Sequence, residues 1–178
     1  AYILTASQTQ NTATSLIRSL KLSSSSTSAQ TLDLGLTALN MILGGTTTAT
    51  PGAILIDGTA AWNINATGGG SLRSAHATAA GDLIFHQYSS GEVTVNADIA
   101  NNGAANTAAV TNLIKAGNGI LILAGAKTFT GAVFVNGGKL QFSDNNQLGA
   151  SATATAVTIR DGATLSYTGA TAAISATG

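Results

Sequence analysis

Charged residues are scarce in this sequence, at 8% of 178 positions against about 25% in an ordinary globular domain. Long amphipathic helices need Glu, Lys and Arg on their exposed faces, so this composition disfavours a helical fold. The formal net charge is zero, and a nucleic-acid partner would require a basic stripe that displaces counterions from phosphates. We expect no such partner, because the basic residues are scattered along the chain: Arg18, Lys21, Arg73, Lys115, Lys127, Lys139 and Arg160.

Cysteine is absent, and proline occurs once. No disulfide can form within the chain, and a zinc site would have to be built from histidines and carboxylates alone. No apolar run approaches the roughly 18 residues of a membrane-spanning helix, so we expect no such span within the chain. With one proline and no evident linker, residues 1–178 predict a single elongated domain rather than two.

Short β-prone runs separated by glycines are the most informative feature, and they are clearest at residues 115–142, KAGNGILILAGAKTFTGAVFVNGGKLQF. The runs at 120–123, 133–135 and 140–142 are rich in Ile, Leu, Val and Phe, as strands that pack on one face require. Glycines between them suit tight corners, and we expect positive φ at Gly131 or Gly138. This pattern predicts the stacked short strands of a β-solenoid, although Asn136-Gly137 also permits a hairpin turn and hence an antiparallel meander.

The same theme recurs at 51–58, 91–98 and 160–169, which read PGAILIDG, GEVTVNAD and RDGATLSYTG. Leu121, Leu140 and Leu165 occupy equivalent places, roughly 20 to 25 residues apart, which is about one turn of a parallel β-helix. At this spacing the chain would form about eight or nine coils, a rod about 40 Å long. Residues 1–50 are less clear: we favour strands, but 39–43 also permit a short helix. We expect these side chains to point inward: Leu121, Leu123, Val133, Val135, Leu140, Phe142, Val157, Ile159 and Leu165.

Residues that could carry chemistry are few. The acidic residues mostly stand beside Gly or Asn, where a carboxylate usually bonds to its own local backbone, and Glu92 with Asp98 is the only pair that we weigh as a catalytic or calcium site. His76, His86 and Asp82 could at most contribute to a zinc site. Trp62 alternates with Ile64 and is expected to pack against a coil face rather than to stack on a sugar. We therefore expect no catalytic site, no metal and no cofactor.

Residues 115–142 resemble the autotransporter-associated β-strand repeat, also called the passenger-associated transport repeat. Its pattern is Lys-x-Gly-x-Gly, a Leu-x-Leu strand, Gly-x-Asn-x-[Tyr/Phe]-x-Gly, a Thr/Val-rich strand and Gly-x-Leu-x-[Leu/Phe]. Lys127 stands where the family usually has Asn, and Ala132-Val133 replaces a commoner Gly-Thr or Thr-Thr. The matching positions, which we interpret as structural, are Lys115, Gly117, Gly119, Leu121, Leu123, Gly125, Phe129, Gly131, Val133, Val135, Gly138, Leu140 and Phe142.

The resemblance implies a right-handed parallel β-helix in a secreted bacterial passenger, with a role for the repeat in efficient secretion. It favours a structural, surface-display segment over two alternatives: an adhesin or carbohydrate-binding surface for host or matrix glycans, and, as the weakest, a polysaccharide-active enzyme. Because the chain starts at Ala1 without a leader, we expect it to be a processed or excised piece. Its uncharged ends predict either further coils or end-to-end self-association into an extracellular filament. Changing Lys127 or Glu92 to Ala should have little effect.

Overall fold

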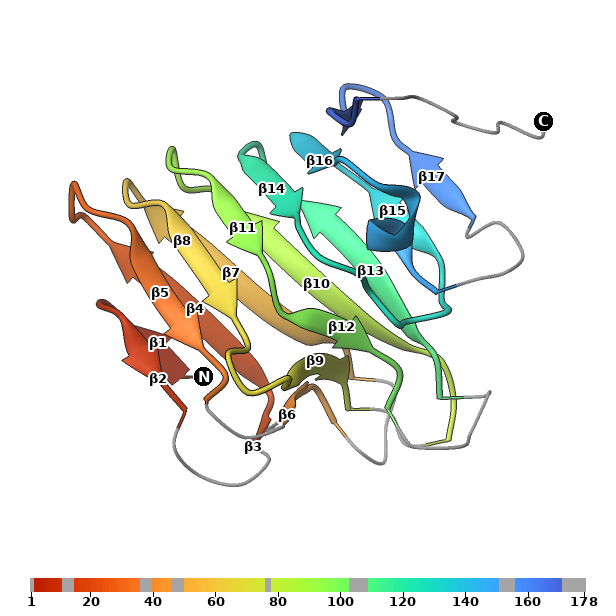
Figure 1. Cartoon of the computed structure of the whole chain (residues 1–178), viewed down its shortest axis with the longest axis horizontal. Coiled ribbons are helices and arrows are strands. Elements are labelled where there is room, and N and C mark those ends of the chain that lie inside the picture. Colours follow the sequence, from red (N-terminus) through yellow and green to blue (C-terminus); the bar gives the residue numbers. More distant parts are fainter. Residues whose placement is uncertain are drawn as a thin grey trace.

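The computed structural model describes residues 2–10, 15–35, 40–45, 50–75, 78–102, 109–150 and 156–170. These residues form three β-sheets (Figure 1). The first sheet contains β1 (Tyr2–Leu4), β4 (Ser19–Ser24), β7 (Gly52–Gly58), β10 (Gly81–Gln87), β13 (Thr111–Ala116), β15 (Val133–Val135) and β17 (Val157–Ile159). The second contains β2 (Gln8–Thr9), β5 (Gln30–Asp33), β8 (Trp62–Asn65), β11 (Val93–Val95), β14 (Ile120–Leu123), β16 (Lys139–Phe142) and β18 (Thr164–Tyr167). The third contains β3 (Ser15–Ile17), β6 (Asn40–Leu43), β9 (Ser71–Ser74) and β12 (Asp98–Ala100).

The chain visits the sheets in turn, so that β1, β2 and β3 belong to the first, second and third sheets and β4 returns to the first. Every strand pairing within the described ranges is parallel, which excludes the antiparallel meander there. Successive coils lie side by side from the red end of the chain to the blue end in Figure 1. The architecture is all-β and consistent with a parallel β-helix. Its handedness stays a prediction.

The interior is lined by alternate residues of each strand, as the period of two requires. In the second sheet Leu121 pairs with Leu140, and Leu140 pairs with Leu165, so one coil separates each leucine from the next. The predicted equivalence of these three leucines is therefore confirmed. Residues 40–43 form β6, which confirms the strand interpretation there, whereas residue 39 lies outside the described residues. Trp62 is completely buried at the start of β8, as expected of a residue that packs within the coils.

Coil length changes along the stack. The register of the first sheet pairs Leu20 with Ile54, Ile54 with Phe85, Phe85 with Lys115 and Lys115 with Val135, so the coils become shorter from Leu20 to Val135. Each of the two larger sheets has seven strands within the described residues, so eight or nine coils are not confirmed. The third sheet ends at β12, and the following coil passes that side as an extended segment whose Thr128 and Phe129 amides bond to the Ile99 oxygen. The next coil has a short 3-10 helix, η1 (Asn145–Leu148), near this side.

Candidate functional site

The corners of the segment at 115–142 depend on glycine in two different ways. Gly117, Gly125 and Gly138 have φ values of 79°, 71° and 63°, in the left-handed region that favours glycine. The expected positive φ is therefore found at Gly138 but not at Gly131. Gly131 is required for space instead, because a Cβ there would lie 2.3 Å from the Thr111 oxygen. Both glycines let neighbouring coils approach at backbone contact distance.

The apolar positions of this segment line the interior. Leu121, Leu123, Val133, Val135, Leu140 and Phe142 are all buried, as predicted. Phe129 is also fully buried and fills the side where the third sheet has ended. Val157 and Leu165 are only partly buried against the core, and Ile159 is 49% exposed. These three residues lie on β17 and β18, which have no further strand beside them in the described part of the chain.

Lys115 occupies an inward position of β13 and is completely buried. Its Nζ donates hydrogen bonds to the backbone oxygens of Ala116 at 3.0 Å, Gly117 at 2.8 Å and Gly137 at 3.0 Å. An ammonium group has three N–H donors, so this set satisfies it without a carboxylate. Burial, which penalises the charged form, lowers the pKa of Lys115 to about 8.

Lys127 is buried as well, with 1% of its surface exposed. Its Nζ donates to the backbone oxygens of Ala124 and Gly125, within the corner that precedes it. Burial lowers the pKa of Lys127 to about 8, an effect that the nearby Asp98 carboxylate partly opposes. The effect of replacing Lys127 stays a prediction, but the burial of this side chain against two carbonyl groups favours destabilisation over the small effect expected from the sequence.

Gln87, at the end of β10, is a buried corner residue that the sequence reasoning missed. Its Nε2 donates to the oxygens of Gly91 at 2.8 Å and Ile120 at 3.2 Å, and its Oε1 accepts from the Ser89 amide at 2.7 Å. The bond to Ile120 joins two successive coils. The sequence pattern that could have predicted its burial is the alternation that begins at Leu83, because this alternation places residue 87 on the inward side.

The Asp carboxylates interact with residues of a neighbouring coil more often than with the backbone of their own turn. Asp98 accepts from the Thr128 amide at 2.8 Å and hydroxyl at 2.6 Å, 30 residues further along the chain. Asp82 accepts from Asn112 Nδ2 at 2.9 Å, and Asp57 forms an ion pair of 2.8 Å with Lys21. The local-turn interpretation is correct for Asp144, which accepts from the Asn146 amide at 3.0 Å.

No cluster of three His, Cys, Asp or Glu side chains suited to a metal ion occurs in the part of the chain that the structure describes. His86 faces outward from β10, with its ring parallel to Tyr88 at a centroid distance of 6.3 Å, while Leu83 and Phe85 are buried, as predicted. His76 lies outside the described residues. Asp98 is already bonded to Thr128, and Glu92 is exposed.

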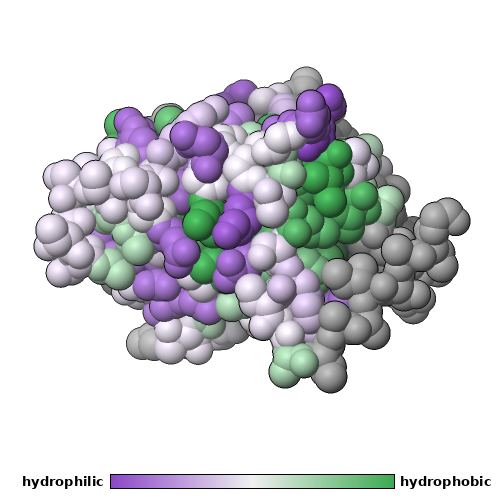
Figure 2. Space-filling view, turned by 90° about the horizontal axis from the view of Figure 1, so that it is seen from above, coloured by the Kyte–Doolittle hydropathy of each residue, from purple (hydrophilic) through white to green (hydrophobic). Residues whose placement is uncertain are grey.

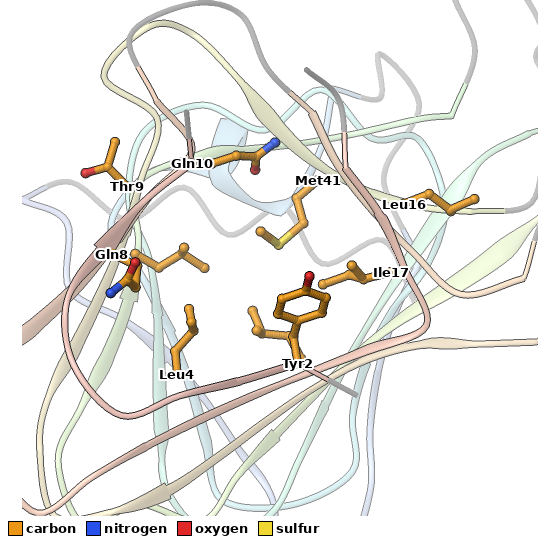
Figure 3. Close-up of a pocket in the computed structure, with 10 residues that line it drawn as sticks. Tyr2, Leu4, Gln8, Thr9, Gln10, Leu16, Ile17 and Met41 are labelled. Carbon is orange, nitrogen blue, oxygen red and sulfur yellow. The ribbon is translucent and has the colours of Figure 1, made fainter. Parts of the chain in front are cut away.

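An open cavity of about 360 Å³ lies at the N-terminal end of the stack. Figure 3 shows Leu4, Ile17 and Met41 around it, together with the ring of Tyr2. Tyr2 and Ile3 are 66% and 61% exposed, and β1 is an edge strand with β4 as its partner. This end therefore presents apolar side chains and, within the described residues, the edges of β1, β2 and β3.

The outer face of the first sheet carries an apolar row of half-buried residues, in which Ile84 pairs with Ile114 and Ile114 with Phe134. The corresponding face of the second sheet is more polar, with Asn63 paired to Thr94. On the side that Figure 2 shows, one larger hydrophobic area and several smaller ones lie among polar residues. The coils therefore present chemically different faces to the solvent.

Comparison with known proteins shows which family the repeat segment resembles. Residues 113–142 match the model of the passenger-associated transport repeat family, which confirms the resemblance seen in the sequence. Over 89 residues, 50% of this chain, the sequence is 38% identical to the adhesin BmaC autotransporter of Brucella suis biovar 1 (strain 1330). The chain spans 2% of the length of that relative. No solved structure matches the chain. Among the described residues no helix is long and apolar enough to cross a membrane.

Proposed function

We propose that residues 1–178 form one structural segment of a bacterial autotransporter-like passenger, displayed on the exterior of the outer membrane. The observation that carries this proposal is the coincidence of the repeat match at 113–142 with an uninterrupted stack of parallel strands. The autotransporter similarity supports display at the cell surface. In this account the coils form a right-handed parallel β-helix, and the segment acts as a scaffold without enzymatic activity.

The repeat contributes to secretion in this account by folding outside the membrane. Each coil makes its hydrogen bonds and apolar contacts mainly with its neighbours, so a folded coil is a template on which the next can form. The segment at 115–142 is suited to start this process because its inward side chains are buried and its corners interlock through Gly117, Gly131 and Gly138. Propagation from such a nucleus would bias the chain toward the outside.

The test uses the full-length reading frame in its host. Gly138→Val should reduce the amount of passenger that antibodies detect on intact cells, because the corner cannot form with a β-branched residue at positive φ. Gly69→Val is the matched control, since Gly69 also has positive φ, at 81°, but a Cβ there has no atom within 4 Å, and it should reduce display less than Gly138→Val does. Unchanged surface display of the Gly138→Val protein would contradict the proposed role of the repeat in secretion.

An adhesive surface is the second candidate, and the similarity to the Brucella protein, which is named an adhesin, favours it. Host or matrix glycans are the proposed partners, with outward Asn and Thr side chains such as Asn63 and Thr94 as hydrogen-bonding groups. Binding of the isolated segment to a glycan array would support this function. Absence of binding to every glycan would leave the scaffold role as the function of this segment.

End-to-end association of two copies is part of the same proposal. The open cavity near Leu4 and Met41 and the free edge of β1 provide a surface that another coil stack could cover. We expect light scattering to show growth of elongated particles with concentration, and negative-stain images to show rods of variable length. A monodisperse monomer across a wide concentration range would contradict self-association.

A further inference from the structure

Lys115 interrupts a row that is otherwise apolar. In the first sheet its pairing partners are Phe85 on one side and Val135 on the other, and both are fully buried. Leu20 and Ile54 continue the same row toward the N-terminus. A cation in such a row loses its hydration, which is costly unless its donors find acceptors inside the protein. The position therefore demands a specific set of partners.

Those partners come from two coils. Ala116 and Gly117 belong to the corner that directly follows Lys115, whereas Gly137 lies 22 residues further along the chain, in the equivalent corner of the next coil. Until that second corner is in place, one N–H of the ammonium group has no protein acceptor and must remain hydrated. Full burial of Lys115 is thus possible only when both corners are folded.

The backbone at the two corners is shaped for this convergence. Gly117 and Gly138 both have positive φ, and a Cβ on Gly138 would lie 2.6 Å from the Gly117 oxygen. The two corners are therefore in direct contact, so their carbonyl groups can reach a single Nζ. The one salt bridge found among the described residues joins Lys21 to Asp57, so no carboxylate replaces these carbonyls at Lys115.

We propose that Lys115 is a coupling residue, whose ammonium group makes the coil that contains β15 and β16 fold and unfold together with the coils before it. Its side chain acts by positioning the corner at Gly137, because it holds that carbonyl against the preceding corner. Only the role of this coupling in secretion rests on the proposed function. The coupling between the coils itself applies equally to the isolated chain.

The experiment compares two signals during urea unfolding of the complete chain. Trp62, the only tryptophan, is buried in β8 and reports by fluorescence on the N-terminal coils, while circular dichroism reports on all strands. The two transitions should coincide in the unaltered protein. In Lys115→Met, which keeps an apolar stem but removes the donors, the circular dichroism transition should begin at a lower urea concentration than the fluorescence transition. Lys139→Met, on the outward side of β16, is the matched control and should leave the transitions coincident.

Coincident transitions in Lys115→Met, at any midpoint, would overturn the proposal, because the coils would then remain coupled without the ammonium group. A second measurement on the unaltered protein applies if Lys115→Met does not fold. In NMR spectra with ¹⁵N-labelled lysine, the Nζ protons of Lys115 should exchange with water at least tenfold more slowly than those of Lys139 and show contacts to the Gly137 α protons. Equal exchange at the two lysines would also overturn it.

Discussion

The ammonium nitrogen of Lys115 lies 3.0 Å from the backbone oxygen of Gly137, which belongs to the following coil. A second buried lysine, Lys127, donates to the oxygens of Ala124 and Gly125. Two buried ammonium groups thus occur in a chain with few charges, and both donate their hydrogen bonds to backbone carbonyl groups. This arrangement has a measurable consequence for stability as the pH changes.

The free energy of unfolding should increase as the pH rises from about 8 toward 10.5. Burial lowers the pKa of Lys115 and Lys127 from 10.5 to about 8, so in this range the folded chain has released protons that the unfolded chain still binds. Stability rises with pH wherever the unfolded state binds more protons, here by up to about 3 kcal/mol per lysine. Urea unfolding at pH 7.0, 8.5 and 9.5 measures the effect. The double variant Lys115→Met/Lys127→Met should lack the rise, and a wild-type protein whose stability falls over this range would contradict the assignment.

Phe129→Ala should destabilise the fold strongly, by about 3 to 5 kcal/mol, because it removes a fully buried ring from the side where the third sheet has ended. Phe134→Ala is the matched control, since Phe134 is half-buried on the outer face of β15. Thermal unfolding of the two variants gives the comparison. Similar losses at both positions would show that Phe129 does not occupy a special place in the core.

Gly138→Ala and Gly162→Ala separate two reasons for glycine at a corner. Both glycines have positive φ, at 63° and 78°, so alanine is strained at either position. Only at Gly138 would the Cβ also meet backbone, with the Gly119 oxygen 2.5 Å away, whereas nothing lies within 4 Å at Gly162. We expect losses of about 1 kcal/mol for Gly162→Ala and more than that for Gly138→Ala. The reverse order in chemical denaturation would be inconsistent with the contact between corners.

The parallel stacking could be predicted from the sequence where alternation was strong. Leu121, Leu140 and Leu165 stand in equivalent Leu-containing runs, and the structure pairs them in register. The number of residues per coil in these runs could not be applied to the whole chain. The coil between Leu20 and Ile54 is longer, and it includes a strand of the third sheet. A short spacing occurs in the C-terminal part, where the third sheet has ended, and also at the N-terminal end, where Tyr2 pairs with Leu20.

The burial of the two lysines was beyond sequence reasoning for a different reason. Lysine is rarely buried without a charged partner, so a lysine within a β-prone segment predicts an exposed position. The partners of Lys115 and Lys127 are backbone oxygens, and their convergence depends on corner geometry rather than on side-chain identity. Gly131 illustrates the same limit, since its role is close approach to Thr111 and not positive φ.

The most direct test of the coil stack is disulfide formation between engineered cysteines, because the chain has none of its own. Thr94 and Ile122 are register partners on the outer face of adjacent strands, and parallel neighbours lie about 4.8 Å apart, within the range that a disulfide spans. Thr94→Cys/Ile122→Cys should therefore cross-link rapidly on mild oxidation, without loss of the folded circular dichroism spectrum. Asn63→Cys/Ile122→Cys, two strands apart, should not cross-link within one molecule. Efficient cross-linking of the second pair, or none of the first, would contradict the parallel register on which the scaffold function rests.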